Sequence, residues 1–315
     1  MTGFLARRLA SLAVTLLLAS LVVFGVLEIL PGDPALLMLG TEAREDTLAA
    51  LRAQMGLDRP APERYLRWVG GLLTGNLGNS LTYGMPVSGL IADRLAVTVP
   101  LALMSMALTV LIALPLGMFA ASHHRRPGDY GVMAFAQVGI SIPNFWFGIL
   151  LILFFAVRLG WVKSGGFPGW NAGVWPAVQA LLLPAVALAL TEAAIMARVT
   201  RAAVLDALQE DYVRTARAKG VSEAGILLGH VLRNALIPVL TIGGLIFAFL
   251  LAGALVIENV FYLPGVGRLV YQAVTQRDLV VVENAVVLLA AMVVVVNFLV
   301  DVLYAVVDPR PKART

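Results

Sequence analysis

The chain has 315 residues, of which 60% are hydrophobic and only 13% are charged, and its mean hydropathy is +0.88. A soluble domain usually carries about a quarter charged residues, so this composition is typical of a protein that crosses a membrane several times. The chain contains no cysteine, which excludes disulfides, thiolate metal sites and thiol catalysis. The formal net charge is only +4, so the positions of the basic residues are more informative than their sum.

The first apolar run covers residues 9–30, which is long enough for a membrane-spanning helix of about 20 residues. The apolar core of a cleaved signal peptide is shorter, about 7–15 residues. We therefore predict an uncleaved first transmembrane helix, residues 1–31, with a cytoplasmic N-terminus.

Residues 32–96 are predicted to form a large loop region outside the cytoplasm. Leu48, Leu51 and Met55 recur at helical spacing, and Gly56 follows as a stop signal. A second short amphipathic helix comes after it. The loop is therefore expected to fold, and it either caps the transmembrane helices passively or gates their outer mouth.

Five further apolar runs lie in the predicted membrane core, residues 97–307, and with the first run they make an all-α polytopic membrane protein with six transmembrane helices. The runs cover residues 97–121, 132–157, 178–198, 235–257 and 284–307. Prolines in the third, fourth and fifth spans are expected to bend or interrupt them, which neighbouring helices make tolerable in membranes. These prolines are Pro143, Pro184 and Pro238.

Two further patterns concern the arrangement of these spans. Arg and Lys of the short connections gather on the side of the N-terminus, which predicts that both termini, including the tail 308–315, are cytoplasmic. Small residues recur every four positions in the fourth and fifth spans, a spacing that lets helices approach closely in lipid. They are Ala185, Ala189, Ala193 and Ala197 in one span, and Gly244, Ala248 and Ala252 in the other.

A charged segment separates the fourth and fifth spans. Residues 198–233 contain ten charged side chains, and each would cost about 2.5–3.5 kcal/mol at the centre of a bilayer. The segment must therefore lie in water or against protein. We take residues 199–234 as one cytoplasmic loop.

The local sequence of this loop predicts a helix, one tight turn and a second helix. Glu210 and Arg214 have the spacing of a helical ion pair, Gly220 suits the left-handed residue that ends a helix, and Ser222 suits the cap of the next one. The apolar residues of the first helix form a narrow stripe: Leu205, Leu208, Tyr212 and Ala216. Such an elbow is either simply solvated or, as the small residues at its corner favour, docked into a groove of another protein.

The sequence lacks the residues of an energy-converting or catalytic site. A phosphate-binding loop needs Gly-Lys-Ser/Thr after a glycine-rich turn, and none of the lysines at 163, 219 and 312 has that context. The histidines at 123, 124 and 230 complete no zinc site. We expect no metal, cofactor or nucleic acid to bind this chain and no enzymatic activity of its own.

The charged loop and five other segments resemble the sequence motifs of a known protein family. "EDYVRTARAKG" at 210–220, followed by "HVLRNALIP" at 230–238, resembles the cytoplasmic signature loop of bacterial ABC importer permeases of the dipeptide/oligopeptide/nickel family. The likeness continues along the chain, in "LPGDPA" (30–35), "GLDRPAPERYLRWVGGLLTGNLGNSL" (56–81), "SIPNFWFGILLILFFAVRLGW" (141–161), "ENVFYLPGVGRL" (258–269) and "VDVLYAVVDPR" (300–310). The general importer signature has a glutamate where this chain has Arg214, so the contact of that glutamate is not carried over.

The resemblance implies a permease subunit in the bacterial inner membrane, within the lipid bilayer. Its implied partners are a homologous permease in a heterodimer, two ABC ATPases that bind ATP and Mg, and an extracytoplasmic solute-binding protein. The implied substrate is a di- or oligopeptide, or a related solute such as glutathione, nickel or an opine. The residues implied to dock on the ATPase are Glu210, Asp211, Tyr212, Arg214, Thr215, Ala216, Arg217, Ala218, Lys219 and Gly220.

Polar residues at membrane depth are candidates for the translocation path because they are costly in lipid. The best candidates are Gln137, Ser141, Asn144 and Asn297. Glu192 also lies in a span and is expected to pair with Arg198 or to reach water. The alternative function, an ion-coupled secondary transporter, would place ionisable groups near the midplane in two repeated halves. Such groups are few here and no repeat is evident.

Overall fold

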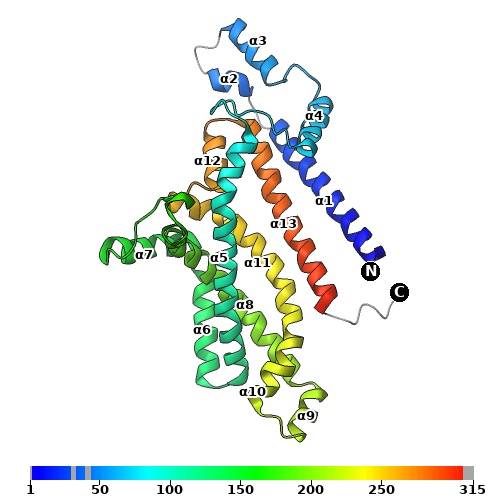
Figure 1. The fold of residues 1–315 in the computed structure, drawn as a ribbon, viewed down its shortest axis with the longest axis vertical. Coiled ribbons are helices and arrows are strands. Elements are labelled where there is room, and N and C mark those ends of the chain that lie inside the picture. Colours follow the sequence, from blue (N-terminus) through cyan, green and yellow to red (C-terminus); the bar gives the residue numbers. More distant parts are fainter. Residues whose placement is uncertain (1, 30–32, 40–43, 308–315) are drawn as a thin grey trace. The chain divides into compact units, whose positions relative to one another are not determined.

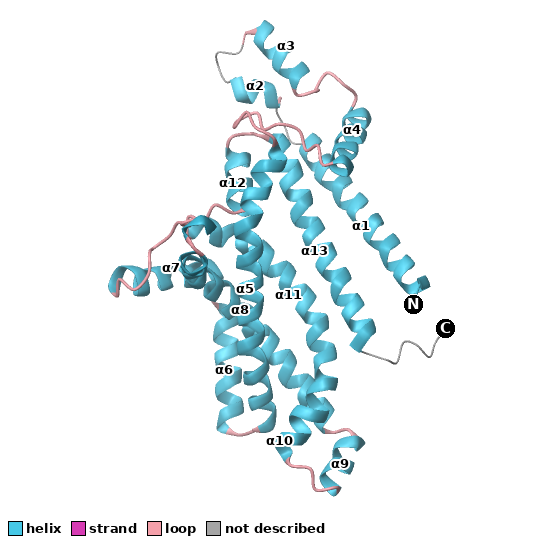
Figure 2. Ribbon diagram, in the orientation of Figure 1, coloured by secondary structure: helices cyan, strands magenta, loops and turns pink. Residues whose placement is uncertain are grey.

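The computed structural model describes residues 2–29, 33–39 and 44–307, and within these residues the chain is helical, without strands. Among these described residues, five stretches are long and apolar enough to cross a membrane (Figures 1 and 2). They lie within α1 (Thr2–Ile29), α5 (Val87–Ser122), α8 (Val174–Leu208), the continuous helical stretch Glu223–Val260 and α13 (Leu279–Val307). The predicted tail 308–315 lies outside the described residues.

The predicted third span, residues 132–157, is not one straight helix. It consists of α6 (Pro127–Ser141) and α7 (Asn144–Leu151), and α7 continues through the π-helical turn η2 (Ile152–Arg158). The two halves meet at 98° and make a sixth span if the bent pair is counted as one. Ile142 between them is extended, with φ −93° and ψ 121°. The break arises because Pro143 disfavours the helical conformation of the residue before it.

The other two prolines have a different outcome. Pro184 lies inside α8 and Pro238 inside α11 (Leu232–Val260), and neither interrupts its helix. Helix α11 is preceded without a break by α10 (Glu223–Ile226) and the π-helical turn η4 (Leu227–Val231). The second helix predicted after the tight turn is therefore the beginning of the fifth span itself.

The chain divides into two compact units, which we describe separately. Unit 1 contains residues 1–97 and 264–295, and unit 2 contains residues 98–263 and 296–315. In unit 1, the predicted loop holds α2 (Pro34–Leu39), α3 (Glu45–Gln54) and α4 (Ala61–Thr74). The two amphipathic helices predicted there are therefore confirmed, and Gly56 after α3 adopts the left-handed φ of 68°.

The core of unit 1 joins segments that are distant in sequence. Buried apolar residues from the start of α5, from α12 (Val266–Thr275) and from the start of α13 pack together. They include Val87, Leu90, Ile91, Val266, Leu269, Ala273, Val281, Val282 and Ala285. The buried Asp278 carboxylate ties this core to the loop, because it accepts hydrogen bonds from Ser80 Oγ and from Thr82 N at 3.1 Å. Helix α5, which contributes to this core, begins at Val87, ten residues before the predicted run 97–121.

Helices α1 and α4 of unit 1 lie side by side (Figure 1), and aromatic rings join them. The Phe24 ring lies 5.4 Å from Tyr65 and 6.1 Å from Trp68. The Tyr65 hydroxyl hydrogen-bonds Ser20 Oγ at 2.9 Å, and Trp68 Nε1 donates to Asn284 Oδ1 at 3.2 Å. The amphipathic helix α4 therefore packs against both α1 and α13 rather than standing free.

Unit 2 is built around α8, whose small-residue ridge is buried as predicted. Ala185, Ala189, Ala193 and Ala197 are at most 2% exposed. The predicted ridge of α11 is confirmed only in part, since Gly244 is buried and faces Asn297 of α13, whereas Ala252 is exposed. Gly253 of α11 lies close to α8, because a Cβ there would be 2.9 Å from Leu188 Cδ2. A four-residue repeat of small residues indicates which face of a helix can pack closely, but it does not indicate which helix packs against that face.

Candidate functional site

The predicted docking loop forms a compact elbow, residues 209–226, between α8 and the fifth span. Helix α8 ends at Leu208, and a two-residue bend leads into the short helix α9 (Asp211–Ala218) (Figure 1). Glu210 is the N-cap of α9, with an extended backbone at φ −69° and ψ 149°. The elbow therefore contains two changes of chain direction, of which only the second was predicted.

The second turn has the hydrogen bonds of a Schellman motif. Gly220 has a φ of 78°, its N–H donates to Arg217 O at 2.9 Å, and the Val221 N–H donates to Ala216 O at 3.2 Å. These two bonds satisfy carbonyls that the end of α9 would otherwise leave free. Ser222 then caps α10 by accepting a hydrogen bond from Gly225 N at 3.2 Å. The predictions for Gly220 and Ser222 are confirmed.

An ion pair spans this turn from outside. Arg217 Nε and Nη2 donate to the two carboxylate oxygens of Glu223 at 2.8 and 3.0 Å. The hydrogen bond to Glu223 raises the pKa of the Arg217 guanidinium above its ordinary value. The pair links the last turn of α9 to the first turn of α10, so it opposes opening of the elbow.

The inner face of α9 rests on an apolar core shared with α8 and the fifth span. Val213 is fully buried and Ala216 is 7% exposed. They pack with buried residues from the ends of α5, α8 and α11 and from the α10–η4 turn. Those residues are Ala121, Ala203, Val204, Ala207, Ile226, Val231 and Ala235. A movement of α9 would therefore be passed directly to three of the long helices.

The residues predicted to dock divide between the two faces of α9. Ala216 points inward and Tyr212 is half-buried, and the enclosed Tyr212 hydroxyl has no hydrogen-bond partner among the described residues. The exposed members are Glu210, Asp211, Arg214, Thr215, Arg217, Ala218, Lys219 and Gly220. Sequence reasoning missed Val213, the most deeply buried residue of the helix. The signal was available, because Val213 is apolar and precedes Ala216 of the predicted stripe by three positions, which is a helical spacing.

The predicted ion pair between Glu210 and Arg214 is wrong. Arg214 Nη1 instead lies 3.3 Å from Asp211 Oδ1. Glu210 is the N-cap and has left the helical conformation, so its side chain is not on the helical face one turn before Arg214.

The four candidates for the translocation path are not brought together. Gln137 and Ser141 are exposed on α6, where Ser141 Oγ donates to Gln137 O at 2.8 Å. Asn144 lies against Gly253, and Asn297 lies against Gly244. Those two glycines are nine residues apart on α11, or about 13.5 Å at 1.5 Å per residue.

Buried charges form contacts that the sequence did not indicate. Arg201 of α8 donates to both oxygens of Asp129 in α6, at 2.5 and 2.7 Å, and the Arg125 N–H adds a third bond at 3.0 Å. Glu258 accepts a hydrogen bond from Thr98 at 2.6 Å. In the described part of the chain, Glu192 is buried with Oε2 lacking a hydrogen-bond partner, and the expected pairing with Arg198 is not observed.

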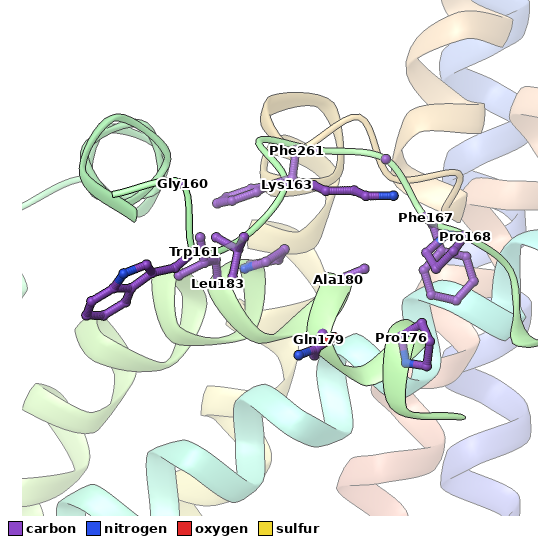
Figure 3. Close-up of a pocket in the computed structure, with 14 residues that line it drawn as sticks. Gly160, Trp161, Lys163, Phe167, Pro168, Pro176, Gln179, Ala180, Leu183 and Phe261 are labelled. Atoms are coloured by element: carbon purple, nitrogen blue, oxygen red, sulfur yellow. The ribbon is translucent and has the colours of Figure 1, made fainter. Parts of the chain in front are cut away.

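A cavity of about 540 Å³ lies in unit 2 beside the glycine-rich loop that leads into α8 (Figure 3). Its walls include aromatic and proline side chains: Trp161, Phe167, Pro168, Pro176, Pro184 and Phe261. Among the described residues that line it, Lys163 is the charged one, and Gln179 adds an amide. Gly166 N donates to Phe261 O at 2.9 Å and fixes the loop. The cavity can hold an apolar group that carries an anion, and none of the four path candidates lines it.

Comparison with known families accounts for nearly the whole chain. Residues 113–313 match the family described as "Binding-protein-dependent transport system inner membrane component". Residues 1–102 match the N-terminal model of the same class of membrane component.

Named relatives match over their full length. A putative peptide transport system permease protein of Brucella suis biovar 1 is 41% identical over 310 residues, covering 98% of this chain and 99% of the relative. A glutathione transport system permease protein of Salmonella paratyphi A is 42% identical over 309 residues, which is 98% of each chain. A probable peptide ABC transporter permease protein of Sinorhizobium fredii is 38% identical over 307 residues, again 98% of each.

The fold is also similar to a solved structure. A chain of the inward-facing MetNI methionine ABC transporter aligns with a TM-score of 0.56 and 21% identity, covering 70% of this chain and 96% of that one. This likeness concerns the fold. Together with the family match and the relatives, it resolves the alternative left open by the sequence: the chain belongs to the family of binding-protein-dependent transport system inner membrane components and is the permease subunit of an ABC importer.

Proposed function

We propose that this permease forms half of a path through which short peptides enter the cell. The observation that carries the proposal is the full-length identity of about two fifths to relatives named for peptide and glutathione transport. Glutathione is itself a small peptide, so the two names agree on a substrate class. An importer of this family works with an ATPase and a solute-binding protein, and we infer that the second half of the path is a homologous permease.

The exposed face of α9 is the proposed contact with the ATPase. Its outer residues are charged or small, whereas its inner residues Val213 and Ala216 are fixed to the ends of the long helices. A rigid connection of this kind can convert closure of an ATPase into a tilt of those helices. Alternating access to the path follows from such a tilt, without any covalent change in the substrate.

The proposed orientation places the elbow and both termini in the cytoplasm, with the helices α2–α4 outside. It is supported by the concentration of Arg and Lys in the short connections on the side of the elbow. The ATPase contact and the solute-binding-protein contact would then lie on opposite sides of the membrane, as import requires.

Reconstitution of the complete transporter in liposomes tests the proposal. With the solute-binding protein outside and ATP inside, we expect uptake of radiolabelled di- and tripeptides that stops when ATP is replaced by a non-hydrolysable analogue. A proton gradient alone is expected to drive none. Uptake of a non-peptide solute, with no peptide transported or competing, would refute the substrate assignment.

A further inference from the structure

The cavity of about 540 Å³ in unit 2 lies between two walls that differ in chemistry. One wall is the loop before α8, which contributes Trp161, Lys163 and Phe167, and the other is the first turns of α8 itself. Figure 3 shows Lys163 on the loop side, and Gln179 and Ala180 on the helix side. The volume is within the range of about 300–1,000 Å³ that is usual for small-molecule sites, so the cavity can hold a small ligand.

Glycines hold the loop wall close to Phe261, which is 2% exposed and lines the cavity. A Cβ at Gly165 would lie 2.6 Å from Phe261 O, so the loop can approach this closely only with glycine there. Gly166 has a φ of 86°, and its N–H donates to Phe261 O at 2.9 Å. The loop is therefore tied to the end of α11, and the cavity that it covers is preformed.

Lys163 gives the cavity an accessible positive charge. Its side chain is exposed, and it forms no ion pair or hydrogen bond with any described residue. Among the described residues of the lining there is no carboxylate to neutralise it. The attraction between an ammonium and a carboxylate is stronger beside apolar walls than in bulk water, because the effective dielectric constant is lower there. The cavity therefore favours an anionic ligand, whose charge can reach Lys163.

The helix wall offers a hydrogen-bond acceptor. Pro184 lies inside α8 and has no N–H, so the helical bond that residue 184 would donate to Ala180 O is missing. Both residues line the cavity, with Pro176 and Leu183 on the same face of the helix. A ligand that carries an N–H group can supply the missing bond. The helix wall therefore favours a hydrogen-bond donor.

An anion, an N–H donor and an apolar group occur together in the C-terminal residue of a peptide. Its carboxylate is matched by Lys163, its N–H by the Ala180 carbonyl, and its side chain by the rings of Trp161 and Phe167. A fatty acid would use the positive charge and the apolar walls, but it has no donor for the carbonyl. A peptide end is the occupant that uses all three features.

We propose that this cavity binds the C-terminal residue of a short peptide, with the carboxylate at Lys163, the last peptide N–H at Ala180 O and an apolar side chain between the aromatic walls. The inference rests on the proposed function, because it takes the substrate class from there. It adds a substrate site in the permease itself. On the proposed orientation this site lies outside the cytoplasm, at the end of α8 opposite the elbow.

Calorimetric titration of the purified transporter complex in nanodiscs, without the solute-binding protein, tests the assignment with alanyl-alanyl-phenylalanine as the probe. We expect the peptide to bind about tenfold more tightly than its C-terminal amide, which lacks the negative charge. It should bind about fivefold more tightly than the depsipeptide in which an ester replaces the last peptide N–H.

Two substitutions in the cavity each remove one of these preferences. Lys163→Gln should abolish the preference for the free carboxylate over the amide and keep the preference for the peptide over the ester. Pro184→Ala introduces an N–H that can bond Ala180 O within the helix. This variant should therefore abolish the preference for the peptide over the ester and keep the preference for the free carboxylate.

Matched substitutions outside the cavity provide the controls. Arg158→Gln removes an exposed positive charge from the end of η2, and Pro238→Ala introduces an N–H inside α11. Neither residue lines the cavity, so both variants should keep both preferences. Equal binding of the three ligands by the wild type, or a preference that survives its own cavity variant, would overturn the proposal. So would Lys163-dependent binding of laurate while the peptide and its ester bind equally, since that result identifies a lipid site.

Uptake by the complete transporter separates this inference from the proposed function. If the wild-type complex transports peptides but shows neither preference in the titration, the cavity assignment fails and the function stands. If the wild-type complex transports no peptide, the proposed function fails, and the titration still decides whether the cavity takes a peptide end.

Discussion

Gly220 is the residue on which the elbow depends most directly. A Cβ at this position would meet no atom within 4 Å in this chain, so the cost of a substitution lies in the φ of 78° alone. That cost is about 1–2 kcal/mol for an L-residue, and a β-branched one suffers most. We expect Gly220→Val to insert and fold but to lose ATPase attachment or to uncouple ATP hydrolysis from uptake.

Gly229 provides a matched control for this substitution. It also has open space for a Cβ but lies within a helical turn with an ordinary φ. Gly229→Val should therefore retain ATPase co-purification and peptide uptake. If Gly220→Val behaves like this control in both assays, the elbow is a solvated turn and the coupling mechanism is wrong.

The ion pair between Arg217 and Glu223 permits a second test at the same scale. Reversing one charge, in Arg217→Glu, places two carboxylates across the turn and should weaken coupling. The double variant Arg217→Glu/Glu223→Arg restores opposite charges and should recover most of it. Coupling is measured as peptide transported per ATP hydrolysed. Failure of the double variant to recover would mean that Arg217 itself contacts the ATPase, rather than bracing the turn.

At the scale of the element, α9 is held by its inner face. Val213→Ala removes two buried methyl groups, which should cost about 2 kcal/mol of local stability. Hydrogen exchange of the α9 amides should accelerate, whereas exchange in the middle of α8 should not change. Thr215→Ala, on the exposed face, should leave the exchange of α9 close to wild type. Unchanged protection in Val213→Ala would show that the core seen around Val213 does not anchor the helix.

Elements that could be predicted from the sequence are those with local causes. Pro143, Gly220 and Ser222 act through their own backbone and its nearest neighbours, and each produced the expected break, turn or cap. Contacts between distant segments could not be predicted in this way. The pair formed by Asp129 and Arg201 joins two helices through residues 72 positions apart, and no pattern in a single sequence records such a pairing.

At the scale of the whole molecule, the division of the chain into two units could not be predicted from the sequence either. The apolar runs predicted the number of spans, but they gave no reason to group α12 and the start of α13 with the α1–α4 segment, as the shared core requires. The candidate path residues stay a prediction, because polarity at membrane depth indicates a cost and not a location. Asn144 and Asn297 each meet a different glycine of α11 instead of a common space.

The orientation of the molecule gives the last prediction. A sequence without cysteine allows single cysteines to report which side of the membrane a position occupies. Leu73 in α4 and Ala218 in the elbow are both exposed and make a matched pair. In intact cells, a membrane-impermeant maleimide should label Leu73→Cys but not Ala218→Cys, and permeabilised cells should label both. The reason is that the basic connections near the elbow resist transfer across the membrane. Labelling of Ala218→Cys from outside would invert the topology and would separate the elbow from any cytoplasmic ATPase, so both the orientation and the coupling role would have to be abandoned together.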